Sequence, residues 1–170
     1  MILAIGGVSN AGKSTLATEI QDVLPEKKIS IICQDDFIAD EKFFPMINGR
    51  PDWEHPESID HEKFMHSITW HHKQDNLVIA EGLLVFHHPE TLRMFDKGIF
   101  IEIERHTFLQ RKNNDFRWGP QPDWYLRHIW ESYMKHGQAE NCSFPLLRIR
   151  GDQPFDMTAI RQFILYGTVD

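Results

Sequence analysis

The fold of this chain is decided by the stretch Gly7-Val8-Ser9-Asn10-Ala11-Gly12-Lys13-Ser14, which matches the phosphate-binding pattern G-x-x-x-x-G-K-[ST]. Residues 2–5 precede it as an apolar run that fits a buried strand, and residues 15–24 follow with apolar side chains along one helical face. In such a unit the glycines let backbone N–H groups turn toward an anion, and the helix N-terminus adds the positive end of its dipole. The stretch therefore predicts a site for the phosphates of a nucleotide.

Within this loop, two side chains are expected to act on the nucleotide directly. Lys13 can reach the β- and γ-phosphates, and the Ser14 hydroxyl can ligate Mg²⁺. We expect ATP and Mg²⁺ as cofactors, with GTP left open as the alternative donor. The loop residues predicted to contact the nucleotide are Gly7, Ser9, Asn10, Ala11, Gly12, Lys13, Ser14 and Thr15.

Length, charge and cysteine content limit the function classes. The 170 residues predict a single domain over 1–170, and the net charge of −7 argues against binding along a nucleic-acid backbone. No apolar run is long enough to cross a membrane, and no cleaved leader is expected before the first strand. Cys33 and Cys142 form no C-x-x-C motif, which favours a reduced, cytoplasmic setting. We expect a small-molecule substrate as partner, and a monomer or small homo-oligomer.

Apolar strands and helical patterns alternate along the chain. Further candidate strands are 29–33, 77–80, 99–103 and 146–149, and candidate helices are 58–72, 90–95, 107–114, 123–135 and 156–166. This alternation predicts an α/β fold of the P-loop NTPase type, with a three-layer parallel sheet of about five strands, helices on both faces and a lid. Ligands gather at the carboxyl ends of such strands, so the polar residues there mark the active face.

Two stretches do not resemble scaffold. Residues 43–56, FFPMINGRPDWEHP, are rich in proline, glycine and aromatics, which favours a substrate-binding loop over about 37–56. Residues 111–122, RKNNDFRWGPQP, concentrate cations in an acidic chain. They predict a mobile lid that closes over phosphates, and a solvated charged turn is the alternative.

Carboxylates follow two of the predicted strands. Asp35 and Asp36 end the second strand, and because neighbours on an extended chain point opposite ways, only one should face the phosphates. A turn or N-cap role is the alternative for either. Glu81 ends the third strand, where an acid can reach Mg²⁺. The alternatives are an acid paired with Lys13 and a solvated acid.

Histidines and aromatics gave weaker signals. The ten histidines include adjacent pairs such as His87-His88, whose members should not face one site, and no metal motif appears. Trp124, Trp130 and Tyr133 stand at helical spacing, which predicts core packing.

Over nearly its whole length the chain resembles the P-loop nucleoside kinases, and among them most the nicotinamide riboside kinases. The matching segments are GVSNAGKST, CQDDF at 33–37, NGRPDWE at 48–54, EGLLVF at 81–86, the Arg111–Lys112 pair, the H-x-W-x-x-Y pattern at 128–133 and residues 151–155. The phosphate loop and the E-G segment are common to many nucleoside kinases. The specific likeness therefore rests mainly on 48–54.

The resemblance implies roles for the matching residues. Asp35 would accept the proton of the ribose 5′-hydroxyl, Trp53 would stack on the base, and Glu54 would hold ribose hydroxyls. The implied catalytic residues are Asp35, Lys13 and Arg111; further nucleotide contacts are Arg111, Arg117, Gln153 and Phe155; substrate contacts are Asp35, Asp36, Phe37, Trp53, Glu54 and Lys112; metal ligands are Ser14, Asp35 and Glu81. The chain departs from the family pattern at Trp53, Glu54 and Lys112, where the family has Tyr, Asp and Arg.

These observations predict transfer of the ATP γ-phosphate to the 5′-hydroxyl of a riboside, foremost nicotinamide riboside in NAD salvage. The positive nicotinamide ring would suit an acidic pocket and the face of Trp53. A kinase for uridine, cytidine or another nucleoside is the first alternative. A non-catalytic nucleotide switch is the second, although the chain lacks D-x-x-G and N-K-x-D motifs.

Overall fold

A five-stranded parallel sheet forms the centre of the molecule in the computed structural model, which describes residues 1–117, 119–140 and 142–167. The strand order is β2-β5-β1-β6-β7, and each neighbouring pair is parallel. The strands are β1 (Ile2–Gly7), β2 (Ile29–Cys33), β5 (Leu77–Gly82), β6 (Lys97–Glu102) and β7 (Leu146–Arg150). Each predicted strand is present, and β1 and β5 run two residues further than expected.

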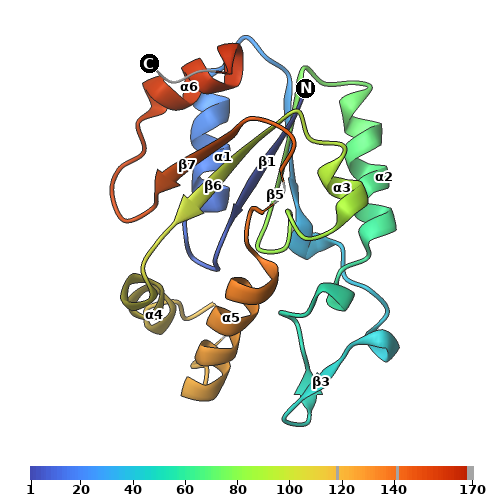
Figure 1. The fold of residues 1–170 in the computed structure, drawn as a ribbon, viewed down its shortest axis with the longest axis vertical. Coiled ribbons are helices and arrows are strands. Elements are labelled where there is room, and N and C mark those ends of the chain that lie inside the picture. The colour runs from blue at the N-terminus through green and yellow to red at the C-terminus, as the bar shows by residue number, and fades with distance from the viewer. Residues whose placement is uncertain (118, 141, 168–170) are drawn as a thin grey trace.

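Helices cover both faces of this sheet (Figure 1). They are α1 (Lys13–Val23), α2 (His61–His72), α3 (Pro89–Leu92), α4 (Arg105–Asn113), α5 (Asp123–His136) and α6 (Met157–Tyr166). In Figure 1, α1 and α6 lie on one side of the sheet, and α2 and α3 lie on the other. This arrangement confirms the predicted three-layer α/β fold of the P-loop type.

The two central strands are buried along their entire length, which explains their apolar sequences. Every residue of β1 and β5 is buried. A parallel strand covered by helices on both faces has no solvent side, so it reads as a continuous apolar run. Burying each large side chain there stabilises the fold by about 1.5–3 kcal/mol.

The register of the sheet brings three strand ends to one edge. Ile5 of β1 pairs with Glu81 of β5, and Glu81 pairs in turn with Cys33 of β2. The phosphate loop, the E-G segment and Asp35 lie at or directly after these strand ends. In Figure 1, α4, α5 and the small hairpin that contains β3 lie beyond the same edge.

The predicted substrate loop is more regular than its composition suggested. It contains short 3-10 turns at Glu41–Phe43 and Pro56–Ser58 and a hairpin of β3 (Met46–Ile47) and β4 (Arg50–Pro51). Asn48 and Gly49 form its turn with φ of 48° and 77°, as a two-residue hairpin turn requires. The expected helix at 58–72 begins only at His61, because Asp60 caps it by accepting from the Lys63 N–H.

The prediction of an extended chain at Asp35 and Asp36 is wrong. Gln34–Asp36 form a 3-10 turn, in which neighbouring side chains diverge by about 120° rather than pointing to opposite sides. The predicted lid begins inside α4, which contains Arg111 and Lys112. Trp118 of the lid lies outside the described residues. No helix in the described part of the chain is long and apolar enough to cross a membrane.

Candidate active site

The loop between β1 and α1 has the backbone of an anion-binding turn. Gly7, Asn10 and Gly12 have φ of 150°, 61° and 106°. A Cβ on Gly7 would lie 2.6 Å from the carbonyl oxygen of Ile101, so only glycine fits there. No side chain caps the first turn of α1, which begins at Lys13. Its N–H groups are therefore available to an anion at the helix N-terminus.

Two oxygen atoms that can ligate a metal ion, one from a hydroxyl and one from a carboxylate, meet beside this loop. The Ser14 hydroxyl donates to Glu81 Oε1 over 2.6 Å, and Glu81 is only 3% exposed. Lys13 instead donates to the carbonyl oxygen of Val8 over 3.2 Å, so the alternative of a Lys13–Glu81 pair is wrong for this structure. A hydroxyl and a carboxylate suit Mg²⁺, which takes one or two protein oxygens and completes its shell with phosphates and water. Among the described residues no group of three His, Cys, Asp or Glu gathers into a fuller metal cage.

A cavity of about 710 Å³ joins the phosphate loop to the hairpin segment. Its walls contain six predicted site residues, namely Ser9, Lys13, Asp35, Trp53, Glu54 and Lys112. The volume lies within the usual range for small-molecule sites. Residues far apart in the sequence thus form one pocket with a phosphate-binding end and an aromatic end.

The aromatic end holds an exposed ring and a perturbed acid. Trp53 is 45% exposed and packs edge-on against Phe44, with ring centroids 4.9 Å apart. Burial in the cavity wall raises the pKa of Glu54 to about 7, and the Lys112 ammonium opposes part of this rise. Burial also lowers the pKa of Lys112. A perturbed acid beside a cation in a cleft is typical of a functional site.

Comparison with known proteins agrees with this geometry, although no family model matches the chain. "Nicotinamide riboside kinase 1" of Rattus norvegicus is 28% identical over 157 residues, which cover 82% of this chain and 80% of that protein. "Uridine kinase" of Chlamydia pneumoniae is 25% identical over 138 residues, covering 66% of this chain and 62% of that protein. The chain is thus similar to kinases that act on ribosides, at 25–28% identity.

Comparison with a solved structure supports the fold. Shikimate kinase from Bacteroides thetaiotaomicron superposes with a TM-score of 0.62 at 18% identity, covering 99% of both chains. At that identity the likeness concerns the fold alone.

Helix α5 holds the aromatic end of the cavity in place. Asp52, only 6% exposed, lies 2.7 Å from His128 Nε2 and accepts from the Glu54 N–H over 3.1 Å. The Ser132 hydroxyl donates to the carbonyl oxygen of Glu54. Sequence analysis missed Asp52 and Ser132. The available signal was the spacing of His128 and Ser132, which places both on one face of a helix.

The predicted lid cations do not reach the cavity as a group. The Arg111 guanidinium donates to the carbonyl oxygens of Asn10 and Gly151 over 3.0 and 2.6 Å, so it ties the phosphate loop to the end of β7. Arg117 pairs with Asp115 over 2.7 Å, and Asp115 also accepts from Asn10 Nδ2 over 3.1 Å. Asp115, which sequence analysis missed, therefore links the lid to the loop.

Other predicted contacts lie at varied positions. The Phe155 ring lies 3.2 Å from the point where a Cβ on Gly12 would stand, and Gln153 is exposed. Asp36 is exposed and does not line the cavity, because the 3-10 turn directs only Asp35 there. Phe37 packs edge-on against Phe64 of the core at 5.3 Å, away from the cavity walls.

The sequence analysis gave no role to Gln34, which lines the cavity. Gln34 is 1% exposed and accepts from the Leu84 N–H through Oε1 over 3.1 Å. Its Nε2 has no hydrogen-bond partner among the described residues. A Cβ on Gly82 would lie 2.4 Å from Gln34 Oε1, so the glycine of the E-G segment makes room for this side chain.

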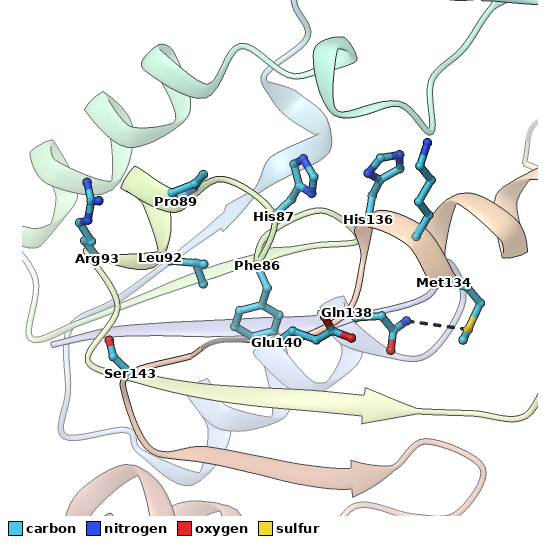
Figure 2. A pocket seen from close by; sticks show the side chains of 11 residues that line it. Phe86, His87, Pro89, Leu92, Arg93, Met134, His136, Gln138, Glu140 and Ser143 are labelled. Carbon is cyan, nitrogen blue, oxygen red and sulfur yellow. Dashed lines mark hydrogen bonds between the residues drawn. The ribbon is translucent and has the colours of Figure 1, made fainter.

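A second cavity, of about 470 Å³, contains none of the predicted site residues (Figure 2). His87 and His136 lie there with ring centroids 5.1 Å apart, and burial lowers the pKa of both. His88 instead stacks on His61 at 4.4 Å, which confirms that adjacent histidines face different neighbours.

The aromatics of α5 pack as predicted. Tyr133 is 4% exposed, and Trp130 packs partly buried against the core beside it. Trp124 also packs against the core.

Proposed function

We propose that this protein transfers the γ-phosphate of ATP to the 5′-hydroxyl of a riboside, with nicotinamide riboside as the first candidate and nicotinamide mononucleotide as the product. One observation carries the proposal: a single cavity is lined by Lys13 of the phosphate loop, by Asp35, and by Trp53 and Glu54. The similarity to nicotinamide riboside kinase and uridine kinase supports the same reaction type.

At the nucleotide end, the loop N–H groups and Lys13 bind the phosphates and stabilise the charge that builds up during transfer. Ser14, Glu81 and Asp35 would hold Mg²⁺ there, and the ion would supply positive charge that neutralises the triphosphate. Arg111, Arg117, Gln153 and Phe155 remain the proposed further contacts of the nucleotide. Phe155 already lies against Gly12, which supports its place beside the nucleotide.

At the acceptor end, Asp35 orients the 5′-hydroxyl and accepts its proton. The new bond forms between the 5′-oxygen and the γ-phosphorus, the bond to the β–γ bridging oxygen breaks, and ADP leaves. Trp53 offers an aromatic face to the base. The Glu54 carboxylate accepts hydrogen bonds from ribose hydroxyls, with Lys112 beside it.

Uridine or cytidine is the second candidate acceptor. The uridine kinase relatives favour it, and a cavity of about 710 Å³ admits either riboside. A cytoplasmic location and a monomer or small homo-oligomer belong to the same proposal.

A coupled assay of ADP release tests the proposal with nicotinamide riboside, uridine, cytidine and adenosine as acceptors. We expect phosphorylation of nicotinamide riboside, and a fall of about 10²-fold or more in kcat for Asp35→Asn. Asp36→Asn is the matched control, because Asp36 lies on the same turn outside the cavity. Nucleotide hydrolysis without any phosphorylated riboside would contradict the proposal and revive the nucleotide switch.

A further inference from the structure

The acceptor end of the cavity carries a cation that the proposed function does not use. Arg50 lines the cavity together with Pro51, Trp53 and Tyr125. It begins β4 and pairs with Ile47 across the hairpin, directly after the turn. The hairpin therefore fixes the point from which this side chain extends.

Within the part of the chain that the structure describes, no carboxylate pairs with Arg50. Its guanidinium lies over the rings of Tyr125 and Trp124, at 5.6 and 6.0 Å from their centroids, and it forms no ion pair with a described residue. Arg117, Arg148 and Arg150, in contrast, each pair with a carboxylate. A guanidinium stacked on a ring keeps its N–H donors in its own plane, where they can meet a planar anion.

The balance of charge around the acceptor does not match the acidic pocket that the sequence suggested. Arg50 and Lys112 line this end together with Asp35 and Glu54, so cations are as numerous as acids. Glu54 is also half protonated near neutral pH, because burial raises its pKa to about 7. A positive pyridinium ring would therefore meet an unpaired cation on the hairpin.

We propose that Arg50 selects ribosides whose base carries a carboxylate over those whose base carries the corresponding carboxamide. This inference rests on the proposed function and concerns the base-binding end of the same cavity. A guanidinium binds a carboxylate through two parallel charge-assisted hydrogen bonds, whereas an amide offers one neutral acceptor and turns N–H donors toward the same fork. The carboxylate also offsets the positive charge of the pyridinium ring.

The decisive experiment compares kcat/KM for nicotinic acid riboside and nicotinamide riboside, which differ only in this group. We expect the wild-type protein to prefer the acid by about tenfold. Arg50→Met keeps an unbranched apolar stem for Trp124 and Tyr125, and it should bring the ratio close to one by raising KM for the acid. Arg50→Lys keeps the charge without the fork, and it should give an intermediate ratio.

Lys42→Met is the matched control, since Lys42 is an exposed cation of the same segment that pairs with Asp40 and does not line the cavity. It should leave the ratio as in the wild type. Raising the ionic strength should reduce the preference for the acid in the wild type and leave the Arg50→Met ratio unchanged.

A wild-type preference for the amide, or an unchanged ratio in Arg50→Met, would overturn the inference while riboside phosphorylation itself stands. Phosphorylation of neither riboside would overturn the proposed acceptor, and the two failures are thereby distinguished.

Discussion

The two ends of the cavity are built by different means. At the nucleotide end, Lys13, Ser14 and Glu81 follow from the strand ends of the sheet, and its register fixes their positions. At the acceptor end, Trp53 and Glu54 stand on a small hairpin segment held by contacts with α5. Changes at the first end should therefore affect every acceptor equally, whereas changes at the second should alter which acceptor binds and how tightly.

The largest effect should come from Lys13→Met at the nucleotide end. Loss of the ammonium removes the positive charge that stabilises the transferred phosphate. The kcat should therefore fall by about 10³-fold with every accepted riboside. Steady-state kinetics with two acceptors measures this. Folding should be preserved, because the Lys13 ammonium bonds only to the Val8 carbonyl among the described residues, and thermal unfolding checks it. A fall in kcat with only one of the two acceptors would contradict the assignment of Lys13 to the nucleotide end.

The next effect should come from Trp53→Ala at the acceptor end. Removal of a stacking face should raise the acceptor KM by about tenfold or more and leave the KM of ATP nearly unchanged. Trp70→Ala is the control, because Trp70 is a similarly exposed tryptophan on α2 outside the cavity. Equal changes in both KM values would show that the two ends are not separable.

A pH profile should sharpen the comparison further. The pKa of Glu54 is raised from 4.5 to about 7 by burial, so its carboxylate form becomes populated as the pH rises through 7. This form is the one proposed to accept hydrogen bonds from ribose hydroxyls. Between pH 6 and 8 the acceptor kcat/KM should rise by about tenfold. Glu54→Gln should remove this rise. A profile that is the same in both proteins would contradict the role of Glu54.

The smallest effect should come from Asp52→Asn, which weakens the support of Glu54 without touching the cavity. The substitution weakens the contacts to His128 and the Glu54 N–H, so the acceptor KM should rise several-fold at constant kcat, and stability should fall by about 1 kcal/mol. Kinetics and thermal unfolding measure the two changes. A fall in kcat at unchanged KM would assign Asp52 to chemistry rather than to positioning.

This difference between the ends also marks what the sequence could predict. β2 was expected at 29–33 and is found there, because apolar periodicity and turn residues determine the backbone of a buried sheet. The positions of Lys13, Ser14 and Glu81 follow from that backbone. The bonds of Asp52 and Ser132 could not be predicted, since they join residues 76 and 78 positions apart in the sequence and depend on how α5 packs.

Local turn geometry limited the prediction in a second way. A single 3-10 turn after β2 removed Asp36 from the cavity and left Asp35 in its wall, although the two acids are chemically equivalent in the sequence. Similarly, Arg111 has the charge expected of a lid residue, yet its guanidinium finds backbone carbonyls within reach. Composition identifies such groups, and only the three-dimensional path of the chain assigns their neighbours.

The turn at the tip of the hairpin has a consequence for how this protein can change. No described residue lies within 4 Å of a Cβ placed on Gly49, so the tip is constrained by its backbone angle and not by packing. Extra residues could be inserted there without disturbing the sheet or the phosphate loop. Exchange of this one hairpin between related enzymes would then change the acceptor preference and leave the phosphate-binding residues unaltered.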